Sequence, residues 1–311
     1  MYIKKYWLPL FFAAFVSPAY ADILVILPES GAMARASENI KRGFLSAYAA
    51  SGSQEKIIFA DSTKNSMDYI FKKKVNNKIK LVVGPLARTD IDAVMQLEPK
   101  LPVLALNDVN QHAENVWQFS LSKQHDAAAL TQLLKNDRVK KLWVLRETGT
   151  EAATELFMQA LSVEFGLEIQ VIDTLPKKIS RKEGLLLLGH HQWIQQLGEL
   201  PEKKVYATPL SIEQGQTIPL GLSFCDTPAL YNGQWVDLIE AYKEQPENMA
   251  FQRLLAFGGD AWTITQYLLS NQNQQQTSFM GRTGAISFKD NKIFRQPTCN
   301  QQQEHGIQIL K

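Results

Sequence analysis

The first candidates for chemistry are short combinations of hydroxyl and basic side chains. Ser120-Leu121-Ser122-Lys123 has the S-x-x-K spacing with which certain serine hydrolases place a nucleophile beside a lysine. The same spacing recurs at Ser53–Lys56, and no S-x-N element separates Ser120 from the faint K-T-G match at Arg282-Thr283-Gly284. We therefore interpret Ser122 as a helix N-cap and expect neither catalytic residues nor enzyme activity.

A second candidate is the adjacent pair His190-His191, which follows a short apolar run. Neighbouring side chains diverge on a strand or a helix, and no third ligand stands at metal-binding spacing. A role in a loop or in the lining of a cleft is therefore preferred to metal binding. The sequence also lacks G-x-S-x-G, phosphate-loop and dinucleotide-binding motifs, so no cofactor is expected.

The elements that must position such residues alternate between short apolar runs and stretches of helical period. The first series predicts helices near residues 32–50, 66–75 and 90–97 between the strands Ile23–Leu27, Ile57–Ala60, Ile79–Val83 and Val103–Leu106. Continuous apolar runs such as Leu81-Val82-Val83 suit strands that helices cover on both faces. Repeated alternation of this kind indicates a parallel sheet.

A second series of the same kind follows. Helices are predicted near residues 123–134, 151–165, 192–197, 235–242 and 249–269, and strands at Lys141–Leu145, Leu167–Ile172, Leu185–Leu188, Val205–Ala207 and Leu220–Phe224. Near the end, Gly284–Phe288 and Lys292–Arg295 alternate like a hairpin that turns at Asp290-Asn291, and Asn271–Gln276 is predicted as a polar loop. The fold class is therefore α/β, with two lobes that each contain a doubly wound parallel sheet.

Polar and turn residues follow several of these strands. Ligands of such folds sit beyond the carboxyl ends of the strands, where helix N-termini also point. If the lobes face each other, these groups converge on one cleft; as the alternative, they are turn and cap residues without a ligand. The candidates are Glu29, Ser30, Gly31, Gly84, Pro85, Leu86, Asn107, Asp108, Glu147, Thr148 and His190.

The beginning of the chain predicts export. Lys4 and Lys5 precede the apolar run Tyr6–Val16, and Ala19-Tyr20-Ala21 offers a cleavage pattern, so residues 1–21 form a predicted signal peptide. The alternative, a membrane anchor, needs about 20 apolar residues. No cysteine lies near the cut, and hence we expect no lipid anchor.

Charge excludes another class of function. The 311-residue chain carries a net charge of +2, which falls to about zero without Lys4 and Lys5. A nucleic-acid-binding protein must neutralise several phosphates, so nucleic acid is not an expected partner.

The two cysteines, Cys225 and Cys299, form an even pair in a chain that is predicted to be exported. A disulfide persists in an oxidising compartment, and two separate buried thiols are the alternative. Neither cysteine has a second ligand at zinc spacing, so no metal site is expected.

Several motifs also resemble a known family. Residues 26–31 (ILPESG), with the following helix to Gly43-Phe44, resemble the opening of type I periplasmic binding folds. Residues 81–86 (LVVGPL) and 101–107 (LPVLALN) are similar to the LppC-type activators of penicillin-binding proteins, as are residues 118–127 (QFSLSKQHDA). Residues 258–261 and 281–288 (GRTGAISF) resemble the late helix and hairpin of that family.

The resemblance implies a type I periplasmic-binding-protein-like (Venus flytrap) fold with three crossings. The lobes would comprise residues 22–119 with 226–270, and residues 120–225 with 271–311. Both cysteines would lie near the lobe junctions, which supports their pairing. Asp260, inside the late-helix motif, joins the cleft candidates.

The resemblance also implies a function. The main expectation is a non-enzymatic periplasmic regulator that contacts a class A penicillin-binding protein, a peptidoglycan synthase, in cell-wall assembly. The alternative is a periplasmic solute-binding protein that closes on an amino acid or a small cell-wall fragment.

Overall fold

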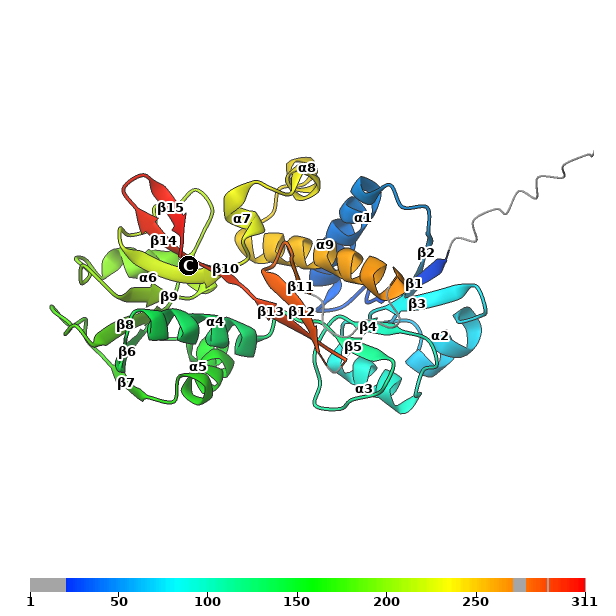
Figure 1. Cartoon of the computed structure of the whole chain (residues 1–311), viewed down its shortest axis with the longest axis horizontal. Coiled ribbons are helices and arrows are strands. Elements are labelled where there is room, and N and C mark those ends of the chain that lie inside the picture. The colour runs from blue at the N-terminus through cyan, green and yellow to red at the C-terminus, as the bar shows by residue number, and fades with distance from the viewer. Residues whose placement is uncertain (1–20, 271–277, 290, 311) are drawn as a thin grey trace, which may run out of the picture.

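Two β-sheets, each flanked by helices, organise the chain (Figure 1). The computed structural model describes residues 21–270, 278–289 and 291–310. The predicted signal peptide, apart from Ala21, and the predicted loop Asn271–Gln276 lie outside the described residues, as does Asp290 of the predicted hairpin turn. Within the described ranges, no helix has the length and apolar character needed to cross a membrane.

The first sheet is built mainly from the first strand–helix series. Its strands run in the order β11-β12-β13-β5-β4-β3-β1-β2, and β1 to β5 are parallel. The elements are β1 (Asp22–Leu27), α1 (Ala34–Ser51), β2 (Lys56–Asp61), α2 (Met67–Lys74), β3 (Ile79–Val83), α3 (Arg88–Gln96), β4 (Val103–Ala105) and β5 (Val116–Gln118). The sequence predicted all of these except β5.

The second sheet is formed in the same way by the second series. Its order is β15-β14-β10-β9-β8-β6-β7, and β6 to β10 are parallel. Its elements are α4 (Lys123–Asn136), β6 (Lys141–Arg146), α5 (Glu151–Phe165), β7 (Glu168–Ile172), β8 (Glu183–Leu188), α6 (His191–Gln196), β9 (Val205–Ala207), the 3-10 turn η1 (Pro209–Ser211) and β10 (Leu222–Asp226). Ser122 caps α4 as predicted, since its hydroxyl accepts a hydrogen bond from the Gln124 amide at 3.1 Å.

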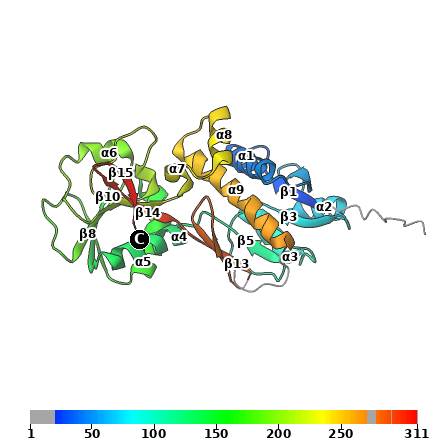
Figure 2. The same ribbon diagram turned by 45° about the horizontal axis from the view of Figure 1, so that its top comes forward.

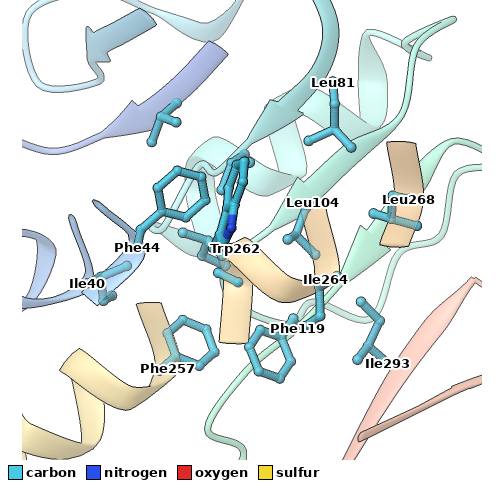
Figure 3. Close-up of a cluster of buried hydrophobic side chains, with 14 of the residues drawn as sticks. Ile40, Phe44, Leu81, Leu104, Phe119, Phe257, Trp262, Ile264, Leu268 and Ile293 are labelled. Carbon is cyan, nitrogen blue, oxygen red and sulfur yellow. The ribbon is translucent and has the colours of Figure 1, made fainter. Parts of the chain in front are cut away.

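The chain then returns to the first sheet through three helices. These are α7 (Ala229–Asn232), α8 (Val236–Glu244) and the 22-residue α9 (Met249–Ser270), which lies against α1 (Figure 2). Trp262 and Phe257 of α9 fill the centre of the first core together with Phe44 of α1 and Phe119. Figure 3 shows these rings converging between the helices and the sheet.

The C-terminal strands divide between the two sheets, which corrects the expected lobe boundaries. Residues 271–311 were expected in the second lobe, yet β11 (Ser278–Met280), β12 (Ala285–Lys289) and β13 (Lys292–Gln296) extend the first sheet, with β13 parallel to β5. The physical reason is burial: Ile286, Phe288 and Ile293 pack into the first core. Only β14 (Thr298–Gln303) and β15 (Gly306–Ile309) join the second sheet.

The predicted disulfide is present and lies where the chain crosses between the sheets. Cys225 and Cys299 face each other on the antiparallel strands β10 and β14. Cys225 precedes the crossing to α7, and Cys299 follows the crossing from β13. The disulfide therefore links two crossing segments that are 74 residues apart in sequence.

Candidate functional site

A pocket of about 360 Å³ lies between the two halves of the molecule. Leu86 and Leu106, at the carboxyl ends of β3 and β4, form one wall together with Phe257 of α9. Leu156 and Ala160 of α5 form the opposite wall. We call this cavity the interlobe pocket; its walls are largely apolar.

The polar rim of the interlobe pocket contains two of the predicted candidates. Asn107 donates a hydrogen bond to the carbonyl of Leu86 at 3.2 Å and accepts one from the Asp108 amide at 3.0 Å. The Asp108 carboxylate lies 3.5 Å from the guanidinium of Arg88. These groups stabilise the strand ends, and each is already engaged with another part of the chain.

Gly84 is explained by packing beneath the pocket. Gly84 has a φ of +95°, and a Cβ atom there would lie 2.0 Å from the carbonyl oxygen of Ile26. Only glycine permits this close approach of β3 to β1. The motif thus shapes the strand end, and among its residues it is Leu86 that reaches the pocket.

The candidates at the end of β1 form a separate polar cluster. The Glu29 amide donates to the Asp61 carboxylate at 3.1 Å, and the Ser30 hydroxyl lies 3.0 Å from that of Thr63. Hydrogen bonds from the Thr63 side chain and amide hold the pKa of Asp61 well below its usual range. Gly31, at a φ of +77°, completes the turn. None of these residues lines the interlobe pocket.

Glu147 and His190 contact each other rather than the interlobe pocket. The Glu147 carboxylate accepts from the His190 amide at 2.7 Å and lies 2.8 Å from its Nδ1. Partial desolvation raises the pKa of Glu147, but the His190 hydrogen bonds outweigh it and the net shift is downward. Thr148 follows in the exposed turn before α5. In the described part of the chain, no group of three or more His, Cys, Asp and Glu side chains is arranged to hold a metal ion.

Asp260 is wrongly predicted as a cleft residue. It is fully buried in α9 and accepts hydrogen bonds of 2.7 Å from the Arg282 amide, the Thr283 amide and the Thr283 hydroxyl. Burial raises the pKa of Asp260. Its carboxylate anchors the turn between β11 and β12 to α9, so the residue is structural.

Two features of the site are not anticipated by the sequence. Leu156 of α5 is 62% exposed and lines the interlobe pocket. Asp226, at the end of β10, pairs with Arg253 of α9 through contacts of 2.7 and 2.6 Å. Neither Asp226 nor Arg253 belongs to a recognised sequence motif. Because the two residues are not neighbours in the sequence, no local pattern predicts their ion pair.

Comparison with known proteins supports the resemblance of the motifs. Residues 12–152 match the family model described as "LppC putative lipoprotein". The chain is also 25% identical over 322 residues to the penicillin-binding protein activator LpoA of Histophilus somni strain 129Pt, covering 93% of this chain and 53% of that protein. The likeness to the LppC family is therefore confirmed. The chain spans about half the length of the curated LppC-type relatives it matches.

Solved structures share the fold. The LpoA C-domain of Haemophilus influenzae, described as a regulator of PBP1A, superimposes with a TM-score of 0.76 at 20% identity and covers 94% of this chain and 100% of that one. A protein of Chromobacterium violaceum described as a "putative branched-chain amino acid ABC transporter" gives 0.76 at 22% identity, over 90% and 99% of the two chains. LppC-type C-domains and amino-acid receptors thus share the type I architecture seen here.

Proposed function

We propose that this chain is a non-enzymatic regulator that acts by direct contact on a class A penicillin-binding protein in the periplasm. One observation carries the proposal: the match to the LpoA C-domain extends over the whole of that domain and nearly the whole of this chain. That domain is described as a regulator of a penicillin-binding protein. The expected export to the periplasm, with cleavage before Asp22, forms part of the same proposal.

The geometry of the candidate site supports contact rather than catalysis. The polar groups at the strand ends are engaged with one another, as in the pairs Glu147–His190 and Arg88–Asp108. Within the S-x-x-K match, Ser122 caps α4 by accepting a hydrogen bond from the Gln124 amide. A regulator needs only a defined surface, and this arrangement provides one.

A solute receptor is the second candidate, because the interlobe pocket has a volume within the range of small-molecule sites. A receptor for an amino acid must hold a carboxylate and an ammonium group. In the pocket rim, the acidic group of Asp108 already faces Arg88. The regulator therefore remains the preferred function.

The decisive experiment measures glycan polymerisation and peptide cross-linking by purified class A synthases with and without the protein. A rate change at stoichiometric protein supports the proposal, whereas an absence of both binding and rate change with every class A synthase of the organism contradicts it.

A thermal-shift screen of amino acids tests the alternative, a solute receptor. A true ligand at about 100 times its Kd stabilises a protein by roughly 2.7 kcal/mol.

A further inference from the structure

The outward face of α5 carries an apolar stripe whose outer residues are largely exposed in the part of the chain that the structure describes. Leu156, Ala160 and Val163 follow one another at helical spacing, so they lie on one face of the helix. Leu156 is 62% exposed and Val163 is 79% exposed. Contiguous exposed apolar surface of this kind marks interaction sites in soluble proteins. We call these three residues the α5 stripe.

The α5 stripe continues into the interlobe pocket. Leu156 and Ala160 line that pocket opposite Leu86, Leu254 and Phe257. The stripe and the pocket therefore form one continuous apolar surface, which we call the groove: α5 borders the pocket on one side and the strand ends and α9 on the other, and Val163 lies on the exposed surface beyond it. From Leu156 to Val163 the helix advances by about 10 Å, which takes the groove beyond the pocket itself.

The border of the α5 stripe is acidic. Residues 151–165 include Glu151, Glu155 and Glu164 and contain no lysine, arginine or histidine. Glu155 lies 3.7 Å from the guanidinium of Arg146, whereas Glu151 and Glu164 accept hydrogen bonds from the uncharged Gly149 amide and Gln124 side chain. On the facing rim, Arg88 and Lys123 each lie within ion-pair distance of an aspartate, at 3.5 and 3.4 Å. The groove therefore favours an occupant that combines an apolar face with basic residues at its edge.

We propose that this groove docks a basic amphipathic segment of the partner protein, laid in it by its apolar face. In helix-in-groove recognition, apolar side chains spaced three and four residues apart on the bound helix insert into the groove. The inference rests on the proposed function and assigns the contact surface for it. A small solute enclosed in the pocket would leave Val163 uncovered. A second copy that paired stripe to stripe would bring the glutamates of α5 against one another, which opposes association.

The test compares two pairs of substitutions with matched exposure. Leu156→Ser with Val163→Ser removes the anchors, while Leu220→Ser with Val236→Ser removes side chains that are 64% and 62% exposed and lie outside the groove. All four side chains are largely exposed, so the fold should tolerate both pairs. Binding to a purified class A penicillin-binding protein is measured by biolayer interferometry. We expect the stripe pair to weaken the Kd at least tenfold and the control pair to change it less than twofold.

A second variant tests the charge of the border. Glu151→Gln with Glu164→Gln keeps the shape of α5, removes two carboxylate charges and leaves the Arg146–Glu155 ion pair intact. We expect association to slow several-fold at low salt, with the difference disappearing at high salt, because rim charges act mainly on the association rate.

The outcomes separate this inference from the proposed function. If the wild-type protein fails to bind any class A synthase, the proposed function fails and the docking groove with it. If the wild type binds and the stripe pair binds equally well, the groove is overturned while the function stands. An equal loss of synthase binding in the stripe pair and the control pair likewise overturns the groove. The groove is also overturned if the stripe pair keeps synthase binding and loses only a thermal shift induced by an amino acid, or only a concentration-dependent dimer.

Discussion

Arg253 shows what a single side chain contributes where the chain crosses between the sheets. Its guanidinium holds Asp226, which is 3% exposed and also accepts from the Tyr231 hydroxyl at 2.6 Å. Arg253→Met would leave that carboxylate buried without a cation, which costs about 3–5 kcal/mol. Urea denaturation measures the loss. Arg35→Met is the control, because Arg35 pairs with Glu247 while 64% exposed and should cost less than about 1 kcal/mol. Equal losses would contradict this account.

The same pair predicts a dependence of stability on pH. Burial raises the pKa of Asp226, but the charge and hydrogen bonds of Arg253 outweigh it, so the pKa lies below the ordinary 3.8. The native state then binds fewer protons than the unfolded state, and the contribution is complete above that ordinary value. It is lost as the pH falls through the lowered native pKa. Denaturation series from pH 7 to about pH 3 should show the stability gap between wild type and Asp226→Asn shrinking in acid; a constant gap would contradict the prediction.

At the scale of elements, the packing of α1 against α9 depends on two glycines. A Cβ on Gly43 would lie 1.8 Å from the carbonyl oxygen of Leu255, and one on Gly258 would lie 2.0 Å from that of Ile40. Both glycines belong to the motifs on which the family resemblance is based. The structure explains why glycine stands at these positions: the backbones of α1 and α9 are in contact there. This role could not be derived from the sequence alone, because a glycine inside a predicted helix indicates only a lower helix propensity at that position.

Gly258→Ala should therefore separate the two helices. Alanine in a helix usually stabilises by about 0.5–1 kcal/mol relative to glycine. Here its methyl group would overlap backbone, and we expect a loss of about 3 kcal/mol or more. Thermal unfolding provides the measurement. Val163→Ala, at an exposed position of α5, should stay within about 0.5 kcal/mol. Stabilisation by Gly258→Ala would contradict the close helix contact.

The limits of sequence-based prediction follow from element length and composition. β3 and α5 have the predicted bounds because a largely apolar run defines the first and a helical period defines the second. β5 spans only Val116–Gln118, too short to show a period, and β14 contains Asn300 and three consecutive glutamines. β14 is a strand because it pairs with β10, which is a tertiary cause with no local signal.

At the scale of the whole molecule, the sequence predicts two sheets but does not predict which strand ends of the two sheets face each other. Glu147 and Glu29 lie just after strands, yet the Glu147 carboxylate contacts His190 and the Glu29 amide donates to the Asp61 carboxylate, and neither residue lines the interlobe pocket. In the described part of the chain, the interlobe pocket is lined at the carboxyl ends of β3, β4 and β5, for example by Leu86, Leu106 and Ser120. Which strand ends face each other depends on the crossings, and these are fixed by contacts between residues far apart in sequence, such as Asp126 of α4 with Arg295 of β13.

The disulfide gives the clearest prediction at this scale, because it joins two of those crossing segments. Cys225 and Cys299 are 74 residues apart, and closing such a loop in the unfolded chain contributes up to about 4 kcal/mol in the chain-entropy model. Cys225→Ala with Cys299→Ala should therefore lower the free energy of unfolding by about 2–4 kcal/mol. Urea denaturation with and without reductant is the measurement. The reductant should shift the wild-type midpoint toward that of the double variant and leave the double variant unchanged. Coincident midpoints for the oxidised wild type and the double variant would contradict a stabilising role of the disulfide.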